Sequence, residues 1–154
     1  MNAHIKVKEI SKMDFAYVSC IGSQNLGAAF EELIQWATPQ GLMNEQTKMA
    51  TIYYDSFKVT EAHKVRMNAC ILLNNPTIKT KDTIGLTTIE EGKYIVANFT
   101  IVISEFEKSW TGLFVWMNDN GYKMADKNPF EIYHNNFNEH PEGKAIVDFY
   151  IPIQ

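Results

Sequence analysis

The feature that most constrains this chain is an internal repeat. When the 154-residue sequence is shifted by 80 positions, residues 15–73 align without a gap on residues 95–153. Nine positions are then identical, where background frequencies give about three or four. The identical residues of the first copy are Ile21, Leu33, Trp36, Gly41, Ile52, Tyr53, Phe57, Lys64 and Ile71. The repeat predicts two related halves with the same order of elements.

Each half reads as strand, strand, helix, strand, strand. Runs rich in β-branched and aromatic residues indicate strands, and apolar residues at the helical period indicate one helix per half. The expected strands cover 5–10, 15–21, 51–57 and 65–73 in the first half, and 84–89, 93–103, 130–137 and 145–153 in the second. The expected helices cover 26–37 and 106–117. The pattern predicts an α+β fold of tandem strand-helix-strand-strand units.

Local signals place the ends of both helices. Ser104 is the expected N-cap of the second helix, with Glu107 three residues on completing a capping box. Gly41 and Gly121 follow the two helices, where a left-handed turn is common.

We expect residues 1–154 to form a single domain, with repeats at about 5–74 and 84–154 and a linker at about 75–83. A half of this size buries little apolar surface alone, so the halves are expected to pack around a pseudo-two-fold axis. Ligand pockets favour such junctions.

Charge and composition exclude several classes of function. The chain has 14 basic and 18 acidic residues, a net charge of −4, and no run of basic residues. Binding to nucleic acid or to an anionic membrane surface is therefore not expected. The two cysteines, Cys20 and Cys70, read as small buried hydrophobes in a reducing compartment. With no signal peptide and no long apolar run, we expect a cytoplasmic protein. The four histidines show no metal-ligand spacing, so neither a metal nor a cofactor is expected.

The sharpest difference between the halves is Glu131, which stands where the first half has Thr51. Side chains alternate along a strand, so Glu131 and Tyr133 share one face and Phe130 and Ile132 share the other. On an inward face the carboxylate would need a partner, and a cationic ligand beside aromatic rings is one. A second interpretation is that Glu131 acts as a general base. A third is that Glu131 faces solvent.

Aromatic residues supply the other pocket candidates. Trp36 and Trp116 are equivalent in the repeat and are interpreted as core. Trp110, Tyr53 and Phe149 remain candidates for ligand contact, with core packing as the alternative for Trp110.

Three segments in a fixed order resemble the GyrI-like small-molecule-binding domain family: residues 89–97, residues 129–133 before an Asn-containing turn, and the terminal strand 145–153. In the first half, residues 52–55 and 63–66 resemble a further family segment. The resemblance covers about residues 4–153. It implies a concave antiparallel sheet with two helices flanking a central cleft, as in the effector-binding parts of AraC-type and multidrug-sensing regulators, which bind cationic aromatic compounds.

The resemblance also implies roles for single residues. Glu131 is at the position of the family's cleft carboxylate, Tyr133 shares the cleft face, and Trp110 matches a pocket aromatic. This sequence departs from the family pattern at two places, one at the edge of the expected cleft and one on the expected surface. A family glycine is kept at Gly22 but absent from the second half, around Val102, and His63 stands where a glutamate is usual.

Three functions remain open at this point. The first is a stand-alone effector-binding protein that captures amphipathic cationic aromatic compounds, with DNA gyrase as an expected partner because some family members inhibit it. The second is a hydrolase of reactive cyclopropanoid toxins, in which Glu131 activates water and Tyr133 assists. The third is a gyrase-interaction protein that binds no ligand.

Overall fold

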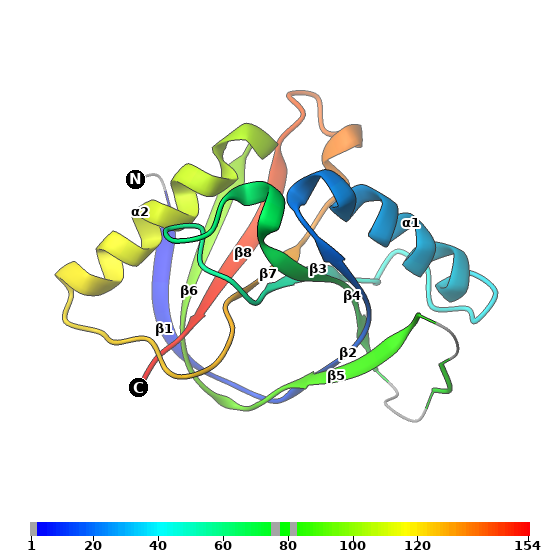
Figure 1. Ribbon diagram of the computed structural model, residues 1–154, viewed down its shortest axis with the longest axis horizontal. Helices are drawn as coiled ribbons and strands as arrows, with labels where there is room; N and C mark the ends of the chain where they lie inside the picture. The colour runs from blue at the N-terminus through cyan, green and yellow to red at the C-terminus, as the bar shows by residue number, and fades with distance from the viewer. Residues whose placement is uncertain (1–2, 75–77, 81–82) are drawn as a thin grey trace. The chain divides into compact units, whose positions relative to one another are not determined.

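A computed structural model describes residues 3–74, 78–80 and 83–154. The chain divides into two compact units, and each is taken by itself below: unit 1 is residues 1–10 with 92–154, and unit 2 is residues 11–91. Within the described residues there are eight strands and two α-helices, and each unit holds four strands and one helix (Figure 1). The predicted α+β class and the strand-helix-strand-strand order are confirmed.

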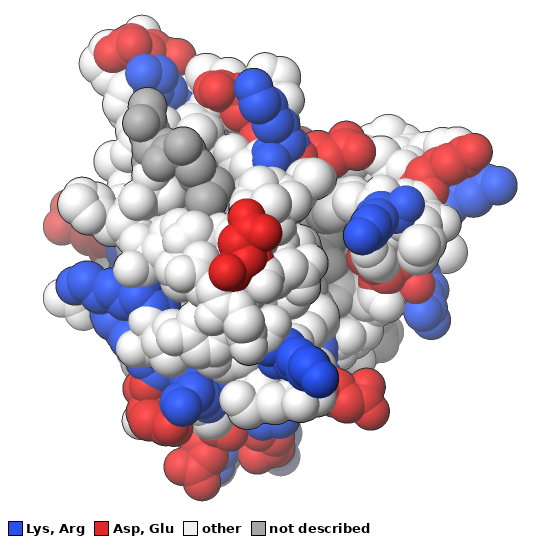
Figure 2. Space-filling model, turned by 90° about the vertical axis from the view of Figure 1, so that its left-hand side faces the viewer, with Lys and Arg blue, Asp and Glu red and all other residues white. Residues whose placement is uncertain are grey.

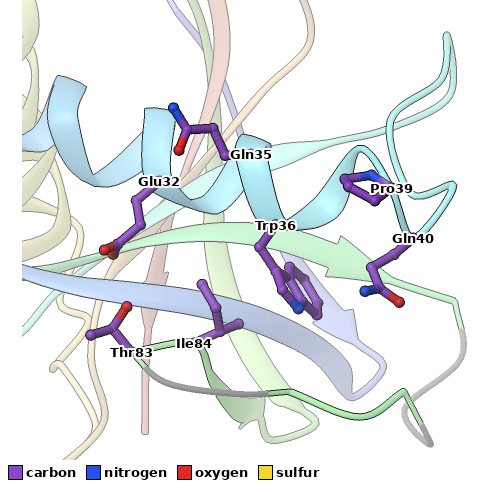
Figure 3. A pocket seen from close by; sticks show the side chains of 7 residues that line it. All are labelled: Glu32, Gln35, Trp36, Pro39, Gln40, Thr83 and Ile84. Carbon is purple, nitrogen blue, oxygen red and sulfur yellow. The ribbon is translucent and has the colours of Figure 1, made fainter.

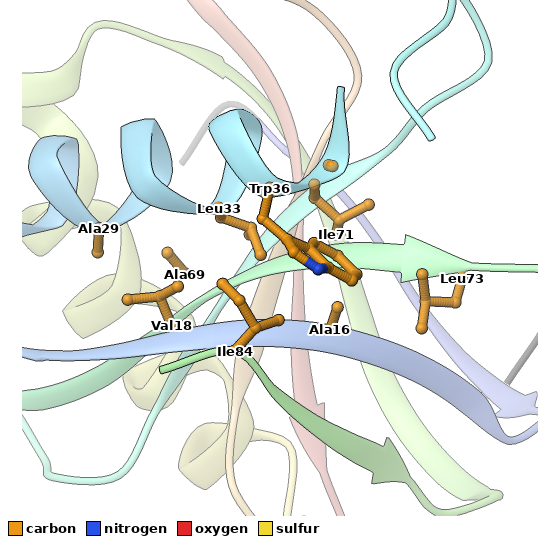
Figure 4. Close-up of a cluster of buried hydrophobic side chains, with 10 residues drawn as sticks. Ala16, Val18, Ala29, Leu33, Trp36, Ala69, Ile71, Leu73 and Ile84 are labelled. Atoms are coloured by element: carbon orange, nitrogen blue, oxygen red, sulfur yellow. The ribbon is translucent and has the colours of Figure 1, made fainter. Parts of the chain in front are cut away.

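Unit 2 is a four-stranded antiparallel sheet with one helix against it. Its elements are β2 (Met13–Ile21), α1 (Leu26–Ala37), β3 (Met49–Tyr53), β4 (Arg66–Leu73) and β5 (Gly85–Ile89). The strand order within the unit is β3-β4-β2-β5. Helix α1 lies on β2 and β4, and its buried side chains meet the small apolar residues of those strands (Figure 4). Leu33 and Trp36 point from α1 into this cluster, which includes Ala16 and Ile71.

Unit 1 has the same layout. Its elements are β1 (His4–Ile10), β6 (Gly92–Ile101), α2 (Phe106–Asp119), β7 (Phe130–Tyr133) and β8 (Ala145–Pro152). The antiparallel order within the unit is β1-β6-β8-β7. On β8 the buried residues alternate, because Val147 and Phe149 face the core while Ile146 and Asp148 are only half-buried on the other side of the sheet.

The two opening strands are present where the sequence predicts them, but each pairs in the unit formed by the other half. Strand β1 pairs with β6, from His4 opposite Asn98 to Ile10 opposite Gly92. Strand β5 pairs with β2, from Met13 opposite Ile89 to Tyr17 opposite Gly85. The chain therefore passes from unit 1 to unit 2 after β1 and returns after β5.

The ungapped alignment of the halves is wrong by one residue in β2 and β6. In unit 2, Ala16 lies opposite Ile71. In unit 1 the residue opposite Ile151 is Ile95, 79 positions after Ala16. The apparent identity of Ile21 and Ile101 is consequently out of register, and the two side chains differ in exposure, 58% against 9%. The extra residue of unit 1 is at the end of β6, which continues to Ile101, because four residues separate strand from helix in both units. In the connection, Val102 replaces the turn made by Gly22, whose φ is +88°.

The observed helix ends agree only in part with those predicted from the sequence. Helix α1 has the predicted bounds, and α2 continues two residues beyond its predicted end at 117. The predicted N-cap at Ser104 is wrong, because Ser104 lies inside a 3-10 turn over residues 103–105. The carboxylate of Glu105 there accepts a hydrogen bond from the N–H of Val102 at 3.3 Å. Gly41 and Gly121 have φ of +72° and +79°, which confirms the left-handed turns.

The predicted linker at about 75–83 falls largely outside the described residues, which omit 75–77 and 81–82.

Both cysteines are free thiols. Cys70 is fully buried and Cys20 half-buried, and burial raises the pKa of both. Among the described residues no helix is long and apolar enough to cross a membrane.

Candidate functional site

Strand β7 turns the carboxylate of Glu131 toward the helix-bearing face of unit 1. Glu131 pairs with Phe149 of β8, and Tyr133 pairs with Val147. Because side chains on paired residues share a face, Glu131 and Tyr133 lie with the buried residues of β8. Glu131 is 1% exposed. Its carboxylate is thus inside the protein, and the interpretation of a solvent-facing glutamate is wrong.

Two neutral donors hold this carboxylate. The indole Nε1–H of Trp110 donates to Oε1 at 2.9 Å, and the hydroxyl of Tyr133 donates to Oε2. Trp110 comes from α2 and Tyr133 from β7, so a helix and a strand both orient the acid. Such bonds reduce the penalty of burying a charged group and fix the directions of its lone pairs.

Aromatic rings surround the acid. The ring of Trp110 is stacked on that of Phe149, with centroids 4.2 Å apart. Phe106, the first residue of α2, has its ring centroid 5.6 Å from that of Phe149 and 6.5 Å from that of Tyr133. The aromatic site of unit 1, as we call it, consists of Glu131, Trp110, Tyr133, Phe149 and Phe106.

The structure brings together four of the five residues singled out from the sequence. Glu131, Tyr133, Trp110 and Phe149 are in contact within unit 1. Tyr53 belongs to unit 2, where it is buried and packs edge-on against Phe57 at 5.1 Å.

Phe106 was not singled out as a site residue from the sequence. A signal for it existed, since it lies four residues before Trp110 on one helix and therefore on the same helical face.

The opposite face of the unit 1 sheet carries a charged network directly behind the aromatic site. Asp148 accepts a hydrogen bond from Asn98 at 2.8 Å and lies 2.8 Å from Nε2 of His134. Burial alone raises the pKa of Asp148, but the hydrogen bonds from His134 and Asn98 and the charges of His134 and Lys8 outweigh it, so the pKa is lowered from 3.8.

Unit 2 has a neutral counterpart of this network. Ser19 donates to Asn68 at 2.8 Å, and Asn68 donates to the hydroxyl of Tyr54 at 2.9 Å. Burial, together with Cys70 and Tyr17, raises the pKa of Tyr54 to about 12, so this network carries no charge at neutral pH. Among the residues that the structure describes, the one buried acid belongs to unit 1, because Thr51 takes the place of Glu131 in unit 2.

A pocket of about 400 Å³ lies in unit 2 and includes none of the five predicted site residues, but it is lined by Trp36, which the sequence analysis interpreted as core. It is formed by the second half of α1 and the residues that lead into β5 (Figure 3). Its lining includes Glu32, Gln35, Trp36, Gln40, Thr83 and Ile84.

Charges are mixed on the side of the molecule that carries α2 and β1. Figure 2 shows acidic and basic side chains interspersed around the margin of this side, with uncharged residues over most of its middle. Among the described residues, no group of three or more His, Cys, Asp or Glu side chains is placed to hold a metal ion.

Comparison with known proteins gives the family. A curated relative, the DNA gyrase inhibitor of Escherichia coli K12, is 29% identical over 159 residues, covering 100% of this chain and 98% of that protein. The solved C-terminal domain of EcmrR has a TM-score of 0.78 at 16% identity and covers 100% of this chain and 99% of that domain. SAV2435, solved with bound tetraphenylphosphonium, has a TM-score of 0.62 at 10% identity, with coverage of 98% and 94%.

The model of the GyrI-like small molecule binding domain matches residues 3–154, nearly the whole chain. The order of elements within each unit is the one that the sequence resemblance led us to expect. This chain belongs to the GyrI-like small-molecule-binding domain family.

Proposed function

We propose that this protein captures amphipathic, cationic aromatic compounds at the aromatic site of unit 1. The observation that carries the proposal is the carboxylate of Glu131, which is 1% exposed and surrounded by aromatic side chains. A buried ionisable group in such a setting is costly to maintain unless it has a task. Binding a positive charge is a task that suits a buried carboxylate beside aromatic rings.

The aromatic rings select the rest of the ligand. The π faces of Phe106 and Tyr133, which are half-buried, attract a cation and also pack against flat apolar groups. Phe149 is fully buried and acts through Trp110, whose ring it supports. The tetraphenylphosphonium bound by SAV2435 is a ligand of this kind in a protein of the same fold, which makes it a suitable first probe.

Access to the acid requires a small movement. Tyr133 is half-buried, whereas Trp110 is 2% exposed and locked between Phe149 and Glu131. We propose that the hydroxyl of Tyr133 leaves Oε2 when a cation binds, while Trp110 keeps its hydrogen bond to Oε1. Tyr53, which lies in unit 2, stays a prediction from the sequence and is not counted in this aromatic site.

The proposal extends to the whole chain. Residues 1–154 would form one effector-binding domain made of two related halves, at about 5–74 and 84–154. The name of the Escherichia coli relative, DNA gyrase inhibitor, supports a role as a modulator of DNA gyrase. We propose that ligand capture links this role to toxin protection.

Isothermal titration with tetraphenylphosphonium tests the binding function. The wild type should bind saturably, and Glu131→Gln, which keeps the side-chain shape, should weaken binding at least about tenfold. Glu139→Gln removes an exposed carboxylate in the same unit and should leave the affinity unchanged. At 100 times its dissociation constant the probe should stabilise the wild type by about 2.7 kcal/mol. Equal binding by wild type and Glu131→Gln would refute the proposal.

The two other functions have distinct outcomes. Hydrolysis of a cyclopropanoid toxin that is lost in Glu131→Gln, with binding retained, would identify a hydrolase instead. Inhibition of gyrase supercoiling that is unchanged in Glu131→Gln, in a protein that binds no probe, would identify a gyrase-interaction protein.

A further inference from the structure

We infer that unit 2 carries a second small-molecule site, the pocket beneath the second half of α1, which takes a planar aromatic amine. The pocket lies wholly within unit 2 and contains none of the residues of the aromatic site in unit 1. Its volume of about 400 Å³ is within the range of pockets that hold small ligands, about 300–1,000 Å³.

The floor of this pocket is apolar and fixed in place. Trp36 and Ile84 are 8% and 7% exposed, and both belong to the core cluster that joins α1 to its sheet. Figure 3 shows Glu32 and Trp36 pointing from α1 toward Thr83 and Ile84. A ligand would therefore meet a preformed surface, which lowers the entropy cost of binding.

Trp36 has a hydrogen-bond donor that the described protein does not use. Its indole N–H donates to no acceptor among the described residues, and every buried side-chain nitrogen or oxygen among them has a partner. The N–H is therefore reachable from outside, on a side chain that is more than nine-tenths buried. An acceptor on a ligand could satisfy Trp36.

The two units differ in what lies beside the equivalent tryptophans. Trp116 of unit 1 is stacked with Tyr122, centroids 6.1 Å apart. Leu42 occupies the same place in the same turn of unit 2, since its N–H bonds the carbonyl of Ala37 just as Tyr122 bonds Met117. Among the described residues no aromatic ring stacks on Trp36. A planar ring in the pocket would supply that type of contact.

The polar side chains of the pocket indicate which functional groups the ligand should carry. The carboxylate of Glu32 and the amides of Gln35 and Gln40 line the pocket and make no side-chain hydrogen bond or ion pair among the described residues. A carboxylate favours an ammonium group, and the amides tolerate donors and acceptors alike. A flat ring with an ammonium group at one end and a hydroxyl at the other matches this arrangement.

The test uses 5-hydroxytryptamine as the probe and the indole N–H signals of the protein in ¹H–¹⁵N spectra. The chain has three tryptophans, and Trp36→Phe assigns the signal of Trp36. We expect a saturable shift of the Trp36 signal with a dissociation constant on the order of 1 mM, while the Trp116 signal stays in place. The neutral analogue 5-hydroxytryptophol should bind several times more weakly.

Matched variants separate this site from others. Glu32→Gln should weaken binding about threefold, while Glu31→Gln, its exposed neighbour on α1, should not change it. Thr83→Phe, at the exposed rim, should block the pocket without removing a core residue. Glu131→Gln should leave the Trp36 shift intact, so failure of the unit 1 proposal would not affect this one.

Three outcomes would overturn the inference. They are the absence of a saturable shift at Trp36, equal affinity in Glu32→Gln and Glu31→Gln, or loss of the Trp36 shift in Glu131→Gln, which would place the probe at the aromatic site of unit 1.

Discussion

The indole ring of Trp110 lies flat on the phenyl ring of Phe149, with centroids 4.2 Å apart and planes inclined by 3°. The same indole donates its N–H to Glu131 at 2.9 Å. The stack prevents the indole from turning, so the donor points at one carboxylate oxygen. A helix residue thereby orients an acid on a strand, and the acid's position depends on packing as much as on hydrogen bonding.

Trp110→Phe should separate these two roles. The variant keeps a ring over Phe149 but removes the donor to Glu131, so we expect the free energy of unfolding to fall by about 1–3 kcal/mol. Urea denaturation measures the change. Trp116→Phe is the control, because Trp116 is half-buried and its ring contact is with Tyr122. An equal loss in both variants would mean that ring size alone is responsible.

Tyr133→Phe removes the hydroxyl that occupies Oε2 of Glu131. If a cation must displace this hydroxyl, affinity for tetraphenylphosphonium should rise about threefold, while stability falls by about 1 kcal/mol. Calorimetric titration and urea denaturation give the two values. Tyr122→Phe, which alters a half-buried tyrosine of the same unit, should change neither. A lower affinity in Tyr133→Phe would indicate instead that the hydroxyl contacts the ligand.

Acid should weaken the protein partly through Asp148. Its pKa in the folded state lies below the ordinary 3.8, so it stabilises the fold above that value and the contribution is lost as pH falls through the folded pKa. Unfolding free energies measured between about pH 5 and pH 2 should fall less steeply in Asp148→Asn. His134→Gln should also reduce the slope, because it removes a bond that lowers the pKa.

Two glycines should respond to alanine with opposite signs. Gly121 has φ of +79° and open space around a built Cβ, so Gly121→Ala should destabilise by about 1 kcal/mol through backbone strain alone. Gly27 lies within α1, also with open space, and Gly27→Ala should stabilise by about 0.5–1 kcal/mol. Thermal unfolding of the two variants tests both signs, and a loss of stability in Gly27→Ala would contradict the helix assignment there.

Local pattern was sufficient for much of the fold and for the core of the site. Apolar spacing gave the bounds of α1, and strand alternation placed Glu131 and Tyr133 on one face. Both signals depend on neighbouring residues only, which is why a single sequence carries them.

What sequence reasoning missed depends on contacts between distant residues. The pairing of β1 with β6 is set by topology, and no local property of residues 4–10 identifies that partner. The one-residue offset between β2 and β6 becomes visible only in the pairing with β4 and β8. The network of Asn98, Asp148 and His134 joins three strand positions far apart in the chain, and its members look unremarkable individually.

The exchange of opening strands has a consequence for synthesis on the ribosome. Strand β1 emerges first, yet the sheet that it completes is made from residues 92–154, at the other end of the chain. Unit 2 lacks only β5 by the time β4 is made, so it can assemble earlier. The half of the molecule that holds Glu131 is thus the last to be finished, and until then the apolar side of β1 must remain in water, where a chaperone could hold it.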